Sequence, residues 1–230
     1  MKFYLDAGTT YSKIICDSLL DKNSEIFSAT TQYFEKDNKT FFIIPTKKLK
    51  TLNLEYERTC GHMGKGCFHE NEIVALAKGS QKYIQKNATI LDMGSRDVKW
   101  IKFKNGKFKD MDWNTSCASS TGATVEMLLK FYDVNIEDLN YCKEKFPITC
   151  GVFGLEKIMD DISKDIEAKD AISKFIHGIA YNAWNFAKKP EKIYLSGGFC
   201  DNKCFCDSLK TYCDVEILGR FILCEGLMND

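Results

Sequence analysis

Near its start the chain reads Asp6-Ala7-Gly8-Thr9-Thr10-Tyr11-Ser12-Lys13. Residues 2–6 predict a strand that ends in a carboxylate, and residues 12–17 predict its hairpin partner. A tight turn of this composition presents backbone N–H groups and hydroxyls that can hold phosphate oxygens, and Asp6 can orient magnesium through water. An ordinary β-hairpin with a Gly-Thr turn has the same pattern, so this stretch alone leaves both interpretations open.

The same arrangement returns in Asp92-Met93-Gly94-Ser95-Arg96-Asp97-Val98-Lys99. Residues 88–93 and 98–103 predict strands on either side of this loop, and an Asn-Gly turn then leads to a third strand over residues 107–113. Arg96 can neutralise phosphate charge. Two copies of one unusual loop favour a phosphate-binding role over two unrelated hairpins.

A third loop, Leu195-Ser196-Gly197-Gly198-Phe199-Cys200-Asp201-Asn202, follows a predicted buried strand at residues 192–195. A helix is expected to run from this loop to about residue 211. Adjacent glycines allow the backbone to approach a nucleotide closely, although Gly-Gly is also a common connector between a strand and a helix.

Strands and helices alternate along the rest of the chain, which indicates an α/β protein. Apolar spacing predicts the further helices 71–85, 119–132, 136–144 and 168–188, and residues 214–218 predict the last strand. The repeated hairpin suggests two related halves. We expect domains at residues 1–87, which residues 219–230 would complete, and at residues 88–218.

Composition excludes several classes of protein. The 230 residues include 32 Lys+Arg and 32 Asp+Glu, so the formal net charge is zero and no overall basic field attracts nucleic acid or an anionic membrane. No signal-peptide pattern opens the chain, and no stretch reaches the roughly 18 apolar residues of a membrane helix. We expect a cytoplasmic protein. Its 11 cysteines then indicate metal ligation, redox chemistry or buried thiols rather than disulfides.

The three loops, in this order, resemble the phosphate and adenosine loops of the actin, sugar-kinase and heat-shock-chaperone superfamily. The resemblance implies two actin-like ATPase domains of related topology, with ATP or ADP and Mg²⁺ in a cleft between them. It assigns catalysis to Asp6, expected to lie exposed, and to Asp92. The expected nucleotide-binding residues are Gly8, Thr9, Thr10, Lys13, Gly94, Ser95, Arg96, Asp97, Gly197, Gly198 and Asn202.

Two cysteine segments narrow the choice within the superfamily. Residues 114–122 (Cys117) and residues 146–154 (Cys150) resemble the two cysteine segments of activators of 2-hydroxyacyl-CoA dehydratases, which are related to ATPase subunits of benzoyl-CoA reductases. The resemblance implies a homodimer with one [4Fe-4S] cluster, held by Cys117 and Cys150 of both subunits. It also implies that ATP hydrolysis drives low-potential electron transfer to a dehydratase-like or related iron-sulfur reductase, with ferredoxin or flavodoxin as the electron donor.

The chemistry of the cluster agrees with this arrangement. A [4Fe-4S] cluster requires four thiolates, and a chain that offers two can complete the site by forming a twofold dimer. Cys117 precedes a predicted helix, whose positive N-terminal end stabilises a thiolate and an anionic cluster.

Two other functions are carried as alternatives. One is a small-molecule kinase of the same superfamily, with Asp97 as the candidate catalytic aspartate and incidental cysteines. The other is a nucleotide-binding protein without chemistry. Neither alternative needs a cluster. Anaerobically purified protein should therefore be brown if it is an activator and colourless if it is one of the other two.

The remaining cysteines have simpler interpretations. Cys60, His62, Cys67 and His69 form a C-x-H-x4-C-x-H array that could bind zinc, but a plain glycine-rich loop is favoured. For the group Cys200, Cys204, Cys206 and Cys213 we favour apolar packing over metal binding.

Overall fold

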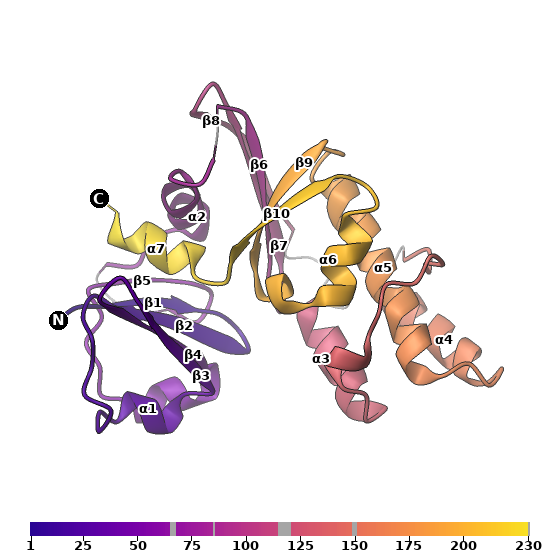
Figure 1. Cartoon of the computed structure of the whole chain (residues 1–230), viewed down its shortest axis with the longest axis horizontal. Helices are drawn as coiled ribbons and strands as arrows, with labels where there is room; N and C mark the ends of the chain where they lie inside the picture. Colours follow the sequence, from indigo (N-terminus) through magenta and orange to yellow (C-terminus); the bar gives the residue numbers. More distant parts are fainter. Residues whose placement is uncertain (65–67, 85, 115–120, 149–150, 230) are drawn as a thin grey trace. The chain divides into compact units, whose positions relative to one another are not determined.

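The computed structural model describes residues 1–64, 68–84, 86–114, 121–148 and 151–229. The chain forms two compact units, Met1–Tyr83 with Arg220–Asp230, and Ile84–Gly219 (Figure 1). Each unit is built around its own five-stranded sheet.

The first unit has the strand order β3-β4-β2-β1-β5. Central strand β1 pairs antiparallel with β2 and parallel with β5. The strands are β1 (Phe3–Ala7), β2 (Tyr11–Cys16), β3 (Gln32–Lys36), β4 (Lys39–Pro45) and β5 (Arg58–Cys60). The helices are α1 (Ile26–Ala29), the 3-10 turn η1 (Thr46–Thr51), α2 (Glu72–Ser80) and α7 (Ile222–Met228).

Helices α2 and α7 lie side by side in this unit (Figure 1), although they come from distant parts of the chain. Glycines make the approach possible. A Cβ atom at Gly79 would overlap the backbone oxygen of Ile222, and one at Gly226 would overlap the backbone oxygen of Ala75. The C-terminal segment therefore belongs to the core of the first unit.

The second unit has the strand order β10-β9-β6-β7-β8. Central strand β6 pairs antiparallel with β7 and parallel with β9. The strands are β6 (Ala88–Met93), β7 (Val98–Lys104), β8 (Lys107–Asn114), β9 (Lys192–Gly197) and β10 (Asp214–Gly219). The helices are α3 (Gly122–Phe131), α4 (Gly151–Ile162), α5 (Ala168–Phe186) and α6 (Lys203–Leu209), with 3-10 turns η3 (Ile136–Asp138) and η4 (Gly198–Asp201).

Helix α5 provides much of the core of the second unit. Most of the apolar face predicted from its periodicity is buried: Ile172, Phe175, Ile176, Ile179 and Ala183 are each at most 4% exposed. Phe186, the last residue of the predicted face, is partly buried. These side chains belong to one cluster with Leu91 and Leu195 of the central strands. The periodic sequence thus identified both the helix and the face that packs on the sheet.

The same motif, an antiparallel hairpin with a parallel third strand, forms the centre of both sheets. It is β2-β1-β5 in the first unit and β7-β6-β9 in the second. The α/β class predicted from the sequence is confirmed, and so is the related topology of the two halves. One helix prediction is wrong, because residues 136–144 form only the short turn η3. Within that stretch Leu139 alone is buried, so a helix there would have no apolar face to pack.

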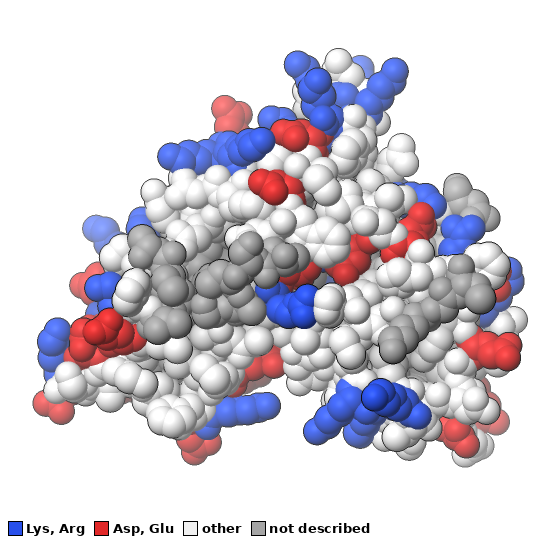
Figure 2. All heavy atoms as spheres, turned by 180° about the vertical axis from the view of Figure 1, so that it is seen from behind, with Lys and Arg blue, Asp and Glu red and all other residues white. Residues whose placement is uncertain are grey.

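The end of the β7–β8 hairpin is basic. The predicted Asn105-Gly106 turn has positive φ at both residues, 53° and 73°, as a two-residue hairpin loop requires. Figure 2 shows lysines gathered over this end, which the exposed residues Lys86, Lys102, Lys104, Lys107 and Lys109 explain. Along edge strand β8, Asp110 and Asp112 accept hydrogen bonds from the following backbone N–H groups. Lysines and these local bonds both disfavour pairing with a further strand.

Among the described residues no helix is both long and apolar enough to cross a bilayer.

The cysteines beside the third loop are packed thiols, as the sequence predicted. Cys200, Cys204 and Cys206 are 8%, 1% and 4% exposed. Burial raises the pKa of Cys204 and of Cys206 from the ordinary 9.0 to about 11. Within the described ranges, three or more His, Cys, Asp or Glu side chains nowhere converge as a metal site would require.

These raised pKa values predict a loss of stability at high pH. The folded state disfavours the thiolates, so the contribution is complete below pH 9 and decreases as pH rises through about 11. The slope is at most about 1.4 kcal/mol per pH unit for each thiol. Urea unfolding at pH 8.5 and 10.5 measures it. Wild type should lose more stability than Cys206→Ala over this interval. A Cys142→Ala control, at a half-buried cysteine, should match wild type, and equal losses in all three proteins would contradict the prediction.

Candidate functional site

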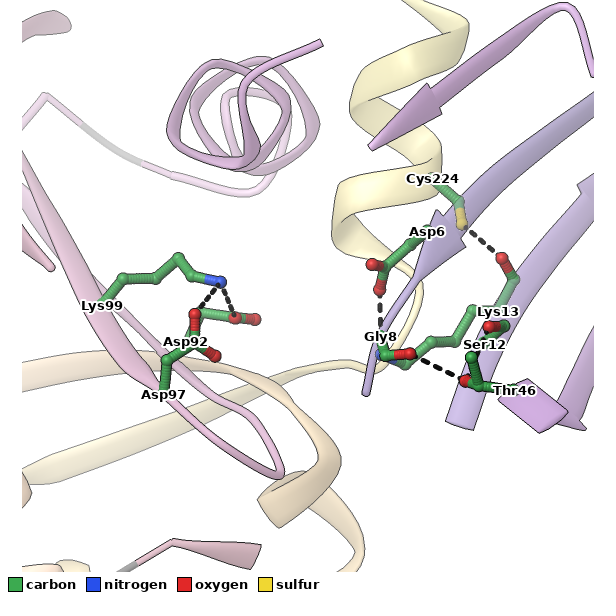
Figure 3. A network of polar contacts seen from close by, with 9 residues as sticks. All are labelled: Asp6, Gly8, Ser12, Lys13, Thr46, Asp92, Asp97, Lys99 and Cys224. Atoms are coloured by element: carbon green, nitrogen blue, oxygen red, sulfur yellow. Dashed lines mark hydrogen bonds and ion pairs between the residues drawn. The ribbon is translucent and has the colours of Figure 1, made fainter. Parts of the chain in front are cut away.

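The first hairpin places a carboxylate and an amine opposite each other. Asp6 on β1 is the register partner of Lys13 on β2, so both side chains leave the same face of the sheet. Lys13 Nζ donates to Asp6 Oδ2 at 2.8 Å (Figure 3). The carboxylate end of β1 therefore carries a paired charge rather than a free one.

A hydroxyl network fixes the turn of this hairpin. Thr46 Oγ1 donates to the carbonyl oxygen of Gly8 at 2.7 Å, and Ser12 Oγ lies 2.9 Å from Thr46 Oγ1. Because the Thr46 proton is used on Gly8, Ser12 donates to Thr46. Thr9 is exposed and Thr10 is partly exposed. The turn thus has a fixed carbonyl on one side and threonines that solvent can reach on the other.

The expectation that Asp6 lies exposed is wrong, because Asp6 is only 5% exposed. Its position inside strand β1 and its bond to Lys13 explain the burial. A carboxylate in this environment is held in one orientation. That rigidity suits water-mediated contact with a cation. It also means that the Asp6–Lys13 ion pair contributes to the stability of the fold.

Asp6→Ala is accordingly expected to lower the free energy of unfolding by about 3 kcal/mol, since it removes the carboxylate from a largely buried ion pair. The Lys13 side chain is only 13% exposed. Asp6→Ala/Lys13→Met should recover part of the loss, because the double variant also removes the buried amine. Urea denaturation measures both effects. If Asp6→Ala is as stable as wild type, the pair contributes nothing to the fold.

The second hairpin has the same register but a different set of partners. Asp92 on β6 is opposite Lys99 on β7, and they are 4% and 2% exposed. Lys99 Nζ lies 3.6 Å from Asp92 Oδ2 and 3.3 Å from Asp97 Oδ2 (Figure 3). Lys99 is therefore shared between two carboxylates of its own hairpin.

Asp92 keeps one oxygen without a protein partner. Asp92 Oδ1 is buried and has no hydrogen-bond partner among the residues that the structure describes, and the same is true of Ser196 Oγ. The two residues are register neighbours on parallel strands β6 and β9. An orphaned buried carboxylate oxygen next to an orphaned hydroxyl needs a water or a cation to complete its bonds. These groups fit a hydrated Mg²⁺, whose preferred ligands are oxygens.

Trp113 on β8 completes the second hairpin. Its Nε1 donates to Asp97 Oδ2 at 2.6 Å, and its ring lies under Lys99 Nζ, 5.0 Å from the ring centre. Gly94 N donates to the Asp97 carbonyl at 3.0 Å, which closes the loop. Asp97 is thereby held by three neighbours.

The third loop follows β9 in the second unit. Gly197 has φ +91°, and a Cβ atom there would overlap the backbone of Met93, so only glycine fits. Asn202, predicted to bind nucleotide, is 4% exposed, and its side-chain oxygen accepts from Phe205 N as the N-cap of α6. Gly198 begins turn η4 and is partly exposed.

The two predicted cluster ligands, Cys117 and Cys150, lie outside the described residues. So does Cys67 of the possible zinc array, whose His69 Nδ1 lies 3.1 Å from Thr59 Oγ1. Arg96 and Ser95 stand in the second loop, both partly exposed.

The sheets and their carboxylate hairpins define an actin-like ATPase fold. The model of the BadF/BadG/BcrA/BcrD ATPase family matches residues 52–223, and the chain belongs to that family. Among relatives, an uncharacterised protein of Methanocaldococcus jannaschii is 25% identical over 166 residues, which are 67% of this chain and 68% of the relative. The (R)-2-hydroxyglutaryl-CoA dehydratase activating ATPase of Acidaminococcus fermentans is 25% identical over 156 residues, 64% of this chain and 60% of that protein.

A solved structure with the same fold is the activator of the 2-hydroxyisocaproyl-CoA dehydratase from Clostridium difficile with bound ADPNP. It superposes with a TM-score of 0.72 at 19% identity and covers 98% of this chain and 91% of that one. The fold predicted from the three loops is confirmed, as is the family resemblance carried by the cysteine segments.

Sequence reasoning missed Ser196 and Trp113 as neighbours of the site. Ser196 stands in the quoted third loop, and its place beside Asp92 follows from the parallel pairing of β6 and β9. Trp113 is the register partner of Lys99. A register drawn through the Asn-Gly turn could have placed Trp113 there.

Proposed function

We propose that this chain is an ATP-dependent reductive activator: it hydrolyses Mg-ATP to drive low-potential electron transfer to a dehydratase-like iron-sulfur enzyme. The observation that carries the proposal is Asp92. Within the described part of the chain it is a buried carboxylate with one unpartnered oxygen. It precedes the glycine turn of the second hairpin, in a chain that belongs to a family of ATPases.

The described residues have distinct roles in this proposal. Asp92 and Ser196 orient the waters around Mg²⁺, and Asp6 does the same from the first hairpin. The N–H groups and hydroxyls of residues 8–10 and 94–96 hold phosphate oxygens. Lys13 and Lys99 form ion pairs that hold Asp6 and Asp92 in place. Arg96 adds positive charge beside the phosphates.

Cys117 and Cys150 are proposed to ligate one [4Fe-4S] cluster in a homodimer. When bound, such a cluster stores a single electron at low potential. Helix α4 begins at Gly151, directly after Cys150, and α3 begins at Gly122, shortly after Cys117. Helix α3 has 10 residues and α4 has 12. The N-terminal end of a helix is partly positive, and a cysteine that shortly precedes it in the sequence is favoured as a thiolate. A reducing compartment such as the cytoplasm suits these thiols.

The names of the relatives support the proposed class of partner enzyme. Proteins named as activators of 2-hydroxyglutaryl-CoA, 2-hydroxyisocaproyl-CoA and lactoyl-CoA dehydratases are similar to this chain. We propose a partner of that chemical class, and a ferredoxin or flavodoxin as donor, because a one-electron carrier must resupply the electron.

The kinase alternative is weaker. It requires Asp97 as a catalytic base, but Asp97 Oδ2 already accepts from Trp113 and lies 3.3 Å from Lys99. This oxygen is already engaged by two donors, which leaves it less available to accept a proton from a substrate hydroxyl.

The test is anaerobic purification followed by iron analysis, visible spectroscopy and an ATPase assay. The proposal expects a brown, reducible protein with about four irons per dimer and magnesium-dependent ATP hydrolysis. A colourless protein that converts ATP to ADP only when a small hydroxyl compound is present, and transfers the phosphoryl group to that compound, would instead identify a kinase.

A further inference from the structure

Residues that flank Cys117 in the sequence, Trp113 before it and Thr121 after it, both bond to the loop of the second hairpin. Before Cys117, Trp113 Nε1 donates to Asp97 Oδ2 at 2.6 Å. After it, Thr121 Oγ1 donates to the Ser95 carbonyl at 2.6 Å. Ala123 N donates to the same carbonyl at 2.9 Å. Residues 114–120 are the chain between these two anchors.

The anchors contact the loop at its functional positions. Ser95 and Asp97 lie between Asp92 and Lys99, the charged pair of the hairpin. Thr121 is only 3% exposed, so its bond is shielded from water. The other anchor, Trp113, donates to a carboxylate, and such a charge-assisted bond is about twice as strong as a neutral one.

The shared lysine makes the contact at Trp113 sensitive to phosphate. Lys99 Nζ lies near Asp92, Asp97 and the Trp113 ring at once. Negative charge arriving at the loop competes with Asp97 for Lys99. The hydrogen bond from Trp113 then becomes the main contact of Asp97 Oδ2. Strand β8, which carries Trp113, would therefore respond to phosphate at the loop.

We propose that Trp113 and Thr121 are positioning residues that transmit nucleotide binding at residues 94–97 to the chain segment containing Cys117. The inference rests on the proposed function, because it takes the second hairpin to be a phosphate site. It adds the two side chains through which the site acts on that segment.

A purely structural role for the two bonds would stabilise β8 and the start of α3 with or without nucleotide. The distinguishing quantity is therefore a nucleotide-dependent difference. Hydrogen–deuterium exchange with mass spectrometry measures it on the full chain, by comparing peptides over residues 92–99 and 114–121 with and without ADPNP and Mg²⁺.

The variants are Trp113→Phe, which keeps a ring but loses the N–H donor, and Thr121→Val, which keeps the shape but loses the hydroxyl. Two matched controls are available. Trp184→Phe removes a similar donor, since Trp184 Nε1 bonds to the Pro190 carbonyl at 3.1 Å. Thr121→Ser retains the hydroxyl that bonds to Ser95.

Wild type and both controls should show nucleotide-dependent exchange in both peptides. In Trp113→Phe and Thr121→Val the difference at residues 114–121 should fall at least threefold, while protection at residues 92–99 persists. If wild type protects residues 92–99 but residues 114–121 do not respond, or if both variants respond as wild type does, the inference is overturned. Absence of protection at residues 92–99 in wild type would instead overturn the proposed phosphate site.

Discussion

Asp92→Asn is expected to lower the rate of ATP hydrolysis by about 100- to 1,000-fold. The substitution keeps the shape of the side chain but removes the charge that orients the magnesium waters. A metal contributes several kcal/mol of transition-state stabilisation, and each 1.36 kcal/mol is a factor of ten in rate. The fold should survive, because Lys99 keeps Asp97 as a partner 3.3 Å away.

The measurement is phosphate release at saturating Mg-ATP. Asp110→Asn is a matched control, because it makes the same chemical change at a residue on β8. Among the contacts described, Asp110 accepts hydrogen bonds from the exposed Lys188 and from the backbone N–H of Met111. The rate of Asp110→Asn should equal that of wild type. Turnover in Asp92→Asn within threefold of wild type would remove Asp92 from the catalytic site.

Cys117→Ser is expected to abolish electron transfer while nucleotide binding remains. A serine hydroxyl is a poor ligand for an iron-sulfur cluster, and a symmetric dimer loses two of its four thiolates through one substitution. Nucleotide binding should persist because Cys117 lies outside both hairpins, which span residues 3–16 and 88–104. Iron content and ADP affinity, measured on one anaerobic preparation, give both results.

Cys142→Ser is the control for this experiment, because Cys142 is a half-buried cysteine outside both cysteine segments. It should keep full iron content. A Cys117→Ser protein that retains the iron of wild type would contradict the assignment of this cysteine as a ligand.

The sequence was most informative where local chemistry decides the structure. An aspartate followed by a glycine turn and a returning strand predicts its own hairpin, and both hairpins form at Asp6 and Asp92. The apolar face of α5 follows directly from its period. These features need only nearby residues.

Features that depend on distant residues could not be predicted. Strand β5 has three residues and exists because it pairs in parallel with β1. Strand β3 is exposed throughout, so it has no alternating apolar pattern. The burial of Asp6 was missed for the same reason: a strand on each side, β2 and β5, covers it.

The third loop shows how one residue type serves two roles. Asn202 follows a glycine pair where the superfamily binds adenosine, yet its side-chain oxygen caps α6. Capping is among the commonest uses of asparagine before a helix. Sequence order alone cannot separate the cap from the ligand, since both need a polar side chain at that position.

The proposed function requires that nucleotide binding and the redox state of the cluster are coupled in this protein. By linkage, a nucleotide that shifts the redox equilibrium must bind the oxidised and reduced protein with different affinities, and the expected coupling is ~1–3 kcal/mol, or about 5- to 150-fold. The decisive measurement is the dissociation constant of ADP and of ADPNP for the oxidised and for the dithionite-reduced protein, under strict anaerobiosis. At least one of the two nucleotides should bind the two redox states with affinities that differ fivefold or more. Equal affinities in both states, for both nucleotides, would contradict the coupling.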